Sequence, residues 1–350
     1  MNSRKGELIR GLILVTFALT SMSCGTDNTA NPEGSEPVEV TGLALDIDYL
    51  ANRYFYLDPP SYVFSAGVFR PDRASLNVFV EDFSPANPWG GVQFAAYAVA
   101  DEESDGLGDV AEDDLGSLYS FRLLEPDREY SIIADSNDNF LGIWLNLLLG
   151  EADILAVSYK GRNDSGDSLT VGDIDLSEVN GWYSENPDTL LLELIKPENN
   201  LPESPTWDYM MRNIYSLGGR DIDYSTLEVE IIRRTTRPDA THPEGFPQFP
   251  YLQIFGLDQF DVGTEGFGHD SKVDKIWIDT QNGLLRFPAD HAFDPSVEEV
   301  FAWTRSELDS FYLDPEDYDR NAAIYNVPHR DLFQDPAYHK YRIEYHWRSK

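Results

Sequence analysis

The sequence has little positive charge and almost no cysteine. Lys and Arg number 26 against 62 Asp and Glu, which gives a formal net charge of −36 over 350 residues. Such a charge repels the phosphates of DNA and RNA, so nucleic-acid binding is excluded. The single cysteine, Cys24, excludes an intramolecular disulfide and leaves no cysteine cluster for zinc.

The motifs of common catalytic sites are also missing. The six histidines show neither the His-x-x-x-His nor the His-Glu-x-x-His spacing of zinc sites. No Gly-x-Ser-x-Gly elbow, phosphate-binding loop or dinucleotide-binding glycine pattern occurs. In so acidic a chain, carboxylate pairs arise by chance and do not indicate a glycosidase. We therefore expect a protein that is not an enzyme.

The apolar run at the N-terminus, Gly11 to Leu19, is too short to cross a bilayer, which requires about 20 apolar residues. It follows Arg4 and Lys5 and is followed by small polar residues. A basic start, a short apolar segment and a small-residue end are typical of a secretory signal peptide. We expect residues 1–23 to be this signal peptide and the rest of the chain to be exported.

Cys24 comes directly after the signal peptide, where bacterial lipoproteins carry their lipidated cysteine. This resemblance implies an acylated N-terminus at the outer membrane or cell surface, with each buried methylene contributing about 0.8 kcal/mol. Ser21 stands where lipoprotein signals usually have leucine. Ordinary cleavage near Ser23, which would leave a free thiol, therefore stays open. Residues 24–37 have the composition of a flexible linker behind the lipid anchor.

Residues 38–200 carry short apolar or alternating runs separated by turn residues. The clearest runs are 42–50, 61–69, 74–83, 91–100, 129–135, 140–149 and 153–160. Strand-length runs at this spacing favour an antiparallel sandwich or barrel over alternating helices and strands. We predict a first β-rich domain over residues 38–200.

Strand patterns continue over residues 201–350. Apolar residues alternate with charged ones at 227–231, before Ile232, and again at 341–346, which predicts half-buried strands. Between them, Asn282-Gly283 separates two apolar runs and supplies the positive φ of a hairpin turn. We predict a second β-rich domain here. The fold class is therefore mainly β, with antiparallel, jelly-roll-like sandwich domains and short helices.

One series of motifs marks the centre of the second domain. The residues that carry it are Trp207, Asp208, Asn213, Tyr215, Gly218, Gly283, Phe287 and Pro288. In order and spacing they resemble the N-terminal domain repeated in SprA/Sov, the large translocon proteins of gliding motility and type IX secretion. Weaker matches extend the resemblance over most of residues 65–347.

The resemblance implies a noncatalytic domain that works through protein–protein contacts in secretion or gliding motility. Expected partners are other proteins of such a complex, and the membrane through the N-terminal lipid. A second interpretation stays open, because a fold can serve more than one function. The chain could be a stand-alone surface lipoprotein or adhesin that binds carbohydrate or calcium.

Two acidic loops have spacings that suit Ca²⁺, the only cofactor that the sequence suggests. The first places carboxylates at loop positions 1, 3, 5, 9 and 12 of an EF-hand pattern, with glycine at position 6. Its residues are Asp101, Glu103, Asp105, Asp109 and Glu112. The second contains Asp258, Asp261, Asp270 and Asp274. Because no helix is expected before the first loop, a plain solvated loop stays the alternative.

The apolar series Trp207, Met210, Met211 and Tyr215 has two interpretations. Its spacing suits a buried core layer, and the same residue types are also common in partner-binding surfaces. We favour packing in the core.

Overall fold

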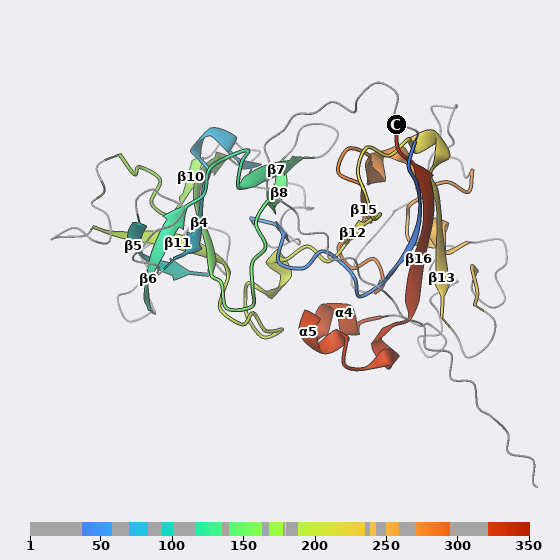
Figure 1. Cartoon of the computed structure of the whole chain (residues 1–350). Helices are drawn as coiled ribbons and strands as arrows, with labels where there is room; N and C mark the ends of the chain where they lie inside the picture. Colours follow the sequence, from blue (N-terminus) through green and yellow to red (C-terminus); the bar gives the residue numbers. More distant parts are fainter. Residues whose placement is uncertain are drawn as a thin grey trace, which may run out of the picture. The chain divides into compact units, whose positions relative to one another are not determined.

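The protein is described here by a computed structural model, in which residues 38–350 form one compact unit. The residues described are 37–57, 70–82, 93–100, 117–134, 140–162, 168–177, 179, 188–234, 239–242, 250–258, 270–294 and 321–350. The described part is mainly β, with strands in several antiparallel sheets and only short helices, so the predicted mainly-β class is confirmed (Figure 1).

The strands are β1 Glu39–Leu45, β2 Tyr54–Phe55, β3 Arg70–Pro71, β4 Asn77–Glu81, β5 Gln93–Val99, β6 Leu118–Leu123, β7 Tyr130–Ala134, β8 Phe140–Leu145, β9 Leu155–Arg162, β10 Ser168–Val171, β11 Thr189–Lys196, β12 Ile214–Ser216, β13 Glu228–Arg233, β14 Ile278–Asp279, β15 Leu284–Arg286 and β16 Tyr341–Arg348. The α-helices are α2 Tyr251–Ile254, α4 Ala323–Asn326 and α5 His329–Leu332. The 3-10 turns are η1 Arg73–Ser75, η3 Trp207–Tyr209, η4 Tyr224–Thr226, η5 Lys275–Trp277 and η6 Pro336–Tyr338.

Five of the described strands close on themselves. They follow one another in the order β9, β11, β5, β6 and β4, and β4 pairs in turn with β9. The pair β11/β5 is parallel and the other four pairs are antiparallel. We call this ring the closed sheet. β10 and β3 extend it by pairing with the second half of β9.

The interior of the closed sheet is filled by aromatic and aliphatic side chains. Phe79 of β4 contacts Phe94 and Phe121 edge-on, with ring centroids 6.1 and 6.5 Å apart. Its neighbours Val78 and Val80 belong instead to the larger core outside the ring. This division follows from the strand geometry, because successive side chains point to opposite faces.

A second, three-stranded sheet has the order β1-β16-β13, and we call it the open sheet. Tyr341, Ile343, Tyr345 and Trp347 of β16 are buried, and the residues between them are partly exposed, which confirms the predicted alternation. The Trp347 indole N–H donates to the Leu217 carbonyl at 2.8 Å. One face of the open sheet therefore covers the core and the other faces outward.

The predicted hairpin at Asn282-Gly283 is present in the sheet β12-β15-β14. Ile278 pairs with Leu285 across it, and Gly283 adopts a φ of +67°. The Asp279 carboxylate accepts hydrogen bonds from two backbone N–H groups of the turn. The strand before the turn is shorter than expected, because η5 occupies part of the apolar run. The fourth sheet has the order β2-β8-β7.

Strand pairing crosses residue 200, where we expected a domain boundary. β1 lies at the start of the first predicted domain and pairs along its full length with β16 at the end of the second. Phe55 likewise forms a bridge with Met210. Described residues on both sides of residue 200 contribute to one main core, and the division into two β-rich domains stays a prediction.

Candidate binding site

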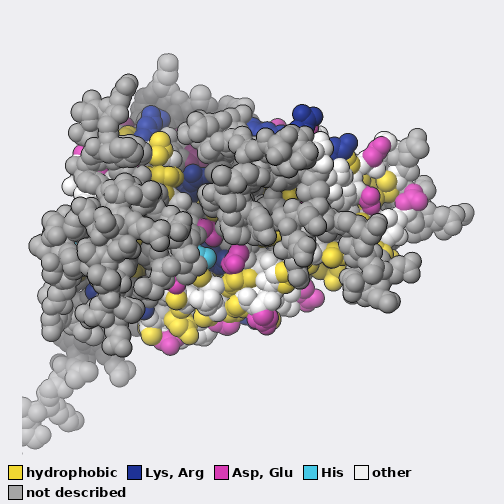
Figure 2. Space-filling model, turned by 180° about the vertical axis from the view of Figure 1, so that it is seen from behind, with side chains coloured by type: hydrophobic (Ala, Val, Ile, Leu, Met, Phe, Trp, Pro, Cys, Tyr) yellow, Lys and Arg dark blue, Asp and Glu magenta, His cyan; other side chains and the backbone are white. Residues whose placement is uncertain are grey.

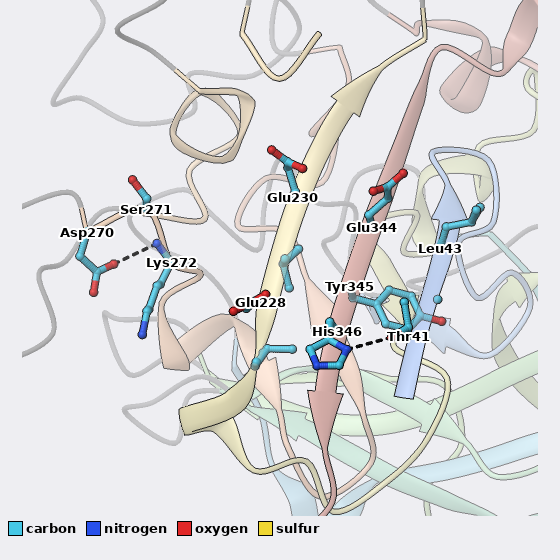
Figure 3. Close-up of a pocket in the computed structure, with 13 residues that line it drawn as sticks. Thr41, Leu43, Glu228, Glu230, Asp270, Ser271, Lys272, Glu344, Tyr345 and His346 are labelled. Atoms are coloured by element: carbon cyan, nitrogen blue, oxygen red, sulfur yellow. Dashed lines mark hydrogen bonds between the residues drawn. The ribbon is translucent and has the colours of Figure 1, made fainter. Parts of the chain in front are cut away.

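A groove of about 730 Å³ lies on the outer face of the open sheet (Figure 3). It is lined by residues 41–43 of β1, 344–346 of β16 and 227–230 at β13. The loop 270–272 borders it beside β13. Sequence analysis did not single out this surface, because the three strands come from distant parts of the chain.

Strand alternation decides which side chains face the groove. Since the odd-numbered residues of β16 point into the core, Glu344 and His346 point outward. Glu228 and Glu230 do the same from β13, where both are exposed. Leu43 of β1 is 57% exposed on this face, which is high for a large apolar side chain within a strand.

The groove is lined by more acidic than basic side chains, with Glu228, Glu230, Glu344 and Asp270 against Lys272. Glu228 and Glu230 have no hydrogen-bond or ion-pair partner within the described residues. Glu230 stands directly opposite Glu344 in the strand register, and like charges in that position repel. Glu344 is compensated, because its carboxylate lies 2.7 Å from the guanidinium of Arg342. The sheet face therefore offers two free carboxylates to a cationic ligand.

His346 links the groove to the edge strand β1. Its Nδ1 lies 2.8 Å from the Thr41 hydroxyl oxygen, and its Nε2 lies 3.2 Å from a carboxylate oxygen of Glu39. A hydroxyl that donates to Nδ1 and an Nε2–H that donates to Glu39 satisfy both contacts. The ring is therefore held in place, and it presents one flat side to the groove.

Trp207, the first residue of the motif series, lies in a buried cluster, and Asp208 is exposed beside it. The Trp207 indole N–H donates to the Tyr325 carbonyl at 2.6 Å, and the Arg212 guanidinium lies 4.2 Å from the centre of the Trp207 ring. Arg212 is fully buried and lies 3.7 Å from the Asp208 carboxylate. The sequence does not distinguish Arg212 from arginines on the surface. Its charge is compensated by a cation–π contact and by backbone carbonyls, including that of Trp207 at 2.7 Å.

Asn213, Tyr215 and Phe287 join two segments of the core. The Asn213 side-chain amide donates to the Phe287 carbonyl at 3.0 Å, and the Phe287 N–H donates to the Asn213 carbonyl at 2.8 Å. The rings of Tyr215 and Phe287 pack edge-on with centroids 5.4 Å apart. The Tyr215 hydroxyl donates to the backbone carbonyl of Asp46 at 2.7 Å.

The two motif glycines occupy positions that exclude a side chain. Gly218 has a φ of +78°, and a Cβ there would lie 2.8 Å from the Tyr345 hydroxyl oxygen. A Cβ on Gly283 would overlap the carbonyl oxygen of Gly219. Pro288 is half-buried directly after Phe287. In the structure these residues position the backbone and fill the core, as do Met210 and Met211, which are both buried.

Asp46 was not distinguished in the sequence from the other acidic residues. It is buried at the end of β1, and its Oδ2 accepts hydrogen bonds from the Asn321 amide at 2.7 Å and from the backbone N–H groups of Tyr341 at 3.0 Å and Lys340 at 3.2 Å. Burial raises the pKa of the Asp46 carboxyl to about 7, although these hydrogen bonds lower it. Asp46 thus joins the end of β1 to the start of β16.

The second acidic loop is only partly described. Asp258 is buried, and its oxygens accept hydrogen bonds from the backbone N–H groups of Asp270 and Ser271, each at 3.1 Å. The Asp274 N–H donates to the Leu257 carbonyl at 2.7 Å. Asp261 lies outside the described residues.

The first acidic loop, with Asp101, Glu103, Asp105, Asp109 and Glu112, lies entirely outside the described residues. Within the described part, no three or more His, Cys, Asp or Glu side chains are arranged to hold a metal ion. Calcium binding by either loop stays a prediction.

Cys24 also lies outside the described residues, so its lipidation stays a prediction. No helix in the described ranges is long and apolar enough to cross a membrane. The chain matches no family model, and no curated protein sequence matches it. The resemblance to the SprA/Sov domain therefore stays a prediction, carried by the motif residues.

Proposed function

We propose that this chain is an exported, lipid-anchored, noncatalytic protein that binds a basic segment of another protein in the groove of the open sheet. The binding would serve a secretion or gliding-motility complex of the SprA/Sov type. One observation carries the proposal: Glu228 and Glu230 face the groove without a partner in the described chain, beside the exposed Leu43.

The charge of the chain selects the class of ligand. A net charge of −36 attracts cations and basic polypeptides and speeds their association. Figure 2 shows acidic side chains among apolar ones on one face of the described surface. In the groove, Leu43 and the carboxylates of Glu228 and Glu230 suit a partner segment with both lysine or arginine and apolar residues. Surface carboxylates are common in so acidic a chain, so their presence in the groove does not favour an enzyme.

The motif residues support a binding role in a second way. Trp207, Tyr215 and Phe287 are buried and bonded within the core, so their side chains are not available to a partner, whereas Asp208 is exposed. Most of the contact surface for other proteins would therefore lie outside the motif. The groove is such a surface, since its lining residues do not belong to the motif series.

The N-terminal segment fits a protein that works close to a membrane. The sequence predicts a linker over residues 24–37, and β1 begins shortly after it. A lipid on Cys24 would tie the chain to the membrane through this linker.

The groove is tested by removing its two free charges. In the full chain in detergent micelles, Glu228→Gln with Glu230→Gln should weaken binding of a short lysine- and valine-containing peptide about tenfold, because each lost ion pair contributes up to about 1 kcal/mol. Added salt should reduce the difference. A matched control, Glu198→Gln with Glu203→Gln, removes two exposed carboxylates elsewhere and should leave the affinity unchanged.

Anchoring is tested separately. Labelled palmitate should enter the wild-type chain and not the Cys24→Ser variant in the native host.

If the chain binds Ca²⁺ or an oligosaccharide in calorimetry and does not bind the basic peptide, the adhesin interpretation replaces the proposed one.

A further inference from the structure

β1 is an edge strand with one side of its backbone unused by the described chain. Antiparallel strands alternate between residues that bond to the neighbour and residues that face away. Two contacts fix this alternation: the Asp46 N–H donates to the Tyr341 carbonyl at 3.2 Å, and the Val38 carbonyl accepts from the Ser349 N–H at 2.8 Å. The even-numbered residues therefore face β16, and the odd-numbered residues face away from it.

The outward backbone N–H groups of β1 differ in whether they already have a hydrogen-bond partner. The Leu45 N–H donates to the Asp48 carboxylate at 2.7 Å, which closes the edge at that end. The N–H groups of Thr41 and Leu43 point away from β16 and have no partner among the described residues. Their side chains line the groove. The free part of the edge and the groove are therefore continuous.

Within the described residues, Glu39 and the Asp48 contact at the far end are the protections of this edge against strand pairing. The sequence of β1, residues 39–45, contains no lysine and no proline, and its pairing with β16 runs over seven residues without a bulge. The opposite edge of the sheet differs. On β13, Arg233 and Ala240 exchange two backbone hydrogen bonds of 2.8 and 3.3 Å.

We infer that the free edge of β1 accepts an extended, basic segment of a partner protein as an added strand. This inference deepens the proposed function and rests on it, because the segment would place alternate side chains over the same groove. Backbone hydrogen bonds to Thr41 and Leu43 would give affinity, and the side chains over the groove would give specificity.

The strand spacing allows a segment bonded to the β1 edge to reach the groove with a basic side chain. Neighbouring strands lie about 4.8 Å apart, so an added strand would lie about 10 Å from β16. A lysine or arginine on the groove face of the segment would pack its methylene groups beside Leu43. It extends far enough to lean across β1 toward Glu344 and His346, which line the groove.

A second copy of the chain fits this edge less well than a basic partner. Antiparallel pairing of two β1 strands about Thr41 would place Glu39 of each copy opposite Leu43 of the other, which sets a carboxylate against an apolar side chain. Each copy also carries a net charge of −36. Self-repulsion therefore opposes the pair, whereas a basic segment is attracted.

The test uses peptides in which the backbone N–H groups along one edge of the peptide strand are removed by N-methylation. The probe is a peptide of about ten residues that alternates lysine and valine, titrated into the full chain in detergent micelles. Two further peptides are N-methylated at all lysines or at all valines. Since an added strand bonds through alternate residues, one methylated peptide should bind at least about tenfold more weakly and the other should bind like the parent.

Variants of the protein provide the reciprocal test. Leu43→Pro removes an outward N–H and should weaken binding about tenfold, whereas Leu43→Ala keeps the N–H and should weaken it about threefold or less. Hydrogen exchange at Thr41 should slow when the peptide binds. A thermal melt shows whether Leu43→Pro is folded, and the methylated peptides give the answer even if it is not.

The outcomes separate this inference from the proposed function. If both methylated peptides bind like the parent while Glu228→Gln with Glu230→Gln weakens binding, strand addition is wrong and the groove remains. If one methylated peptide loses binding while the glutamate variant does not, strand addition holds without the groove charges. If the parent peptide does not bind, both are overturned.

Discussion

The closed sheet and the open sheet use the same kind of strand in opposite ways. In the closed sheet every strand of the ring has a neighbour on both sides, and Phe79, Phe94 and Phe121 fill the interior. The open sheet, with β16 between β1 and β13 (Figure 1), covers the core with one face, and its β1 edge pairs with no further strand among the described residues. Both contain alternating apolar residues.

The difference separates scaffold from binding surface. The ring strands of the closed sheet satisfy one another's backbone groups, so little is left for a partner along the ring. The open sheet carries the features without an internal role: the free carboxylates of Glu228 and Glu230, the exposed Leu43 and the outward N–H groups of β1. Substitutions inside the closed sheet should therefore affect stability, and those on the outer face should affect binding.

The largest effect is expected inside the closed sheet. Phe121 is fully buried and packs on Phe79 and Tyr119. Phe121→Ala should lower the free energy of unfolding by about 3–5 kcal/mol, because it removes a buried ring and leaves a cavity. Denaturant unfolding measures the change.

The matched control lies on the same strand. Leu118 is 41% exposed, and Leu118→Ala should change the free energy of unfolding by about 0.5 kcal/mol or less. Equal effects of the two substitutions would show that the ring has no specific core.

A pH-dependent effect is expected in the open sheet. The Asp46 carboxyl has a pKa of about 7 in the folded chain, above its value of about 3.9 in an unfolded chain. The folded state therefore binds this proton more tightly. Its stabilising contribution is complete below about pH 4 and is lost as the pH rises to 7, up to about 4 kcal/mol at about 1.4 kcal/mol per pH unit.

Asp46→Asn isolates this contribution. The unfolding free energy of the wild type should decrease between pH 4 and 7, whereas that of the variant should not. Unfolding of both proteins is measured at several pH values. Above pH 7, hydrogen exchange should quicken in β1 and β16 of the wild type more than in the closed sheet, because Asp46 contacts Tyr341 and Lys340. A wild-type stability that does not change over this range would contradict the assignment.

A smaller loss is expected where the hairpin supports the open sheet. Gly283→Ala should lower the free energy of unfolding by at least about 2 kcal/mol, because φ is +67° and the added Cβ overlaps the Gly219 carbonyl. Gly150→Ala is the control, since its Cβ would meet the Asp153 carboxylate at an ordinary 3.4 Å. Thermal unfolding of the two variants distinguishes backbone strain from a general cost of the added methyl group.

Most strands could be predicted because their signal is local. Residues 341–346 alternate strictly, and the burial of β16 follows that alternation. The runs at 74–83, 91–100 and 153–160 contain or overlap β4, β5 and β9 in the same way. β6 was missed, because Leu118–Leu123 places Ser120 and Arg122 among its buried positions and so lacks a clear apolar face.

The arrangement of the strands could not be predicted, because it depends on contacts between distant residues. Ring closure requires β4 to pair with both β6 and β9, and no local pattern encodes that choice. The groove unites β1 with β13 and β16 from far along the chain. Asp46 and Arg212 look like surface charges in the sequence, and only their buried partners distinguish them.

The smallest expected effect tests the outer face of the open sheet directly. Glu230 stands opposite Glu344 and has no described partner. Glu230→Gln should raise the free energy of unfolding by about 0.2–0.5 kcal/mol, because it removes a like-charge pair, and high salt should abolish the gain. The same substitution should weaken binding of the basic peptide. A residue whose removal improves stability and impairs binding is retained for the ligand, whereas a loss of stability would mean that Glu230 supports the sheet.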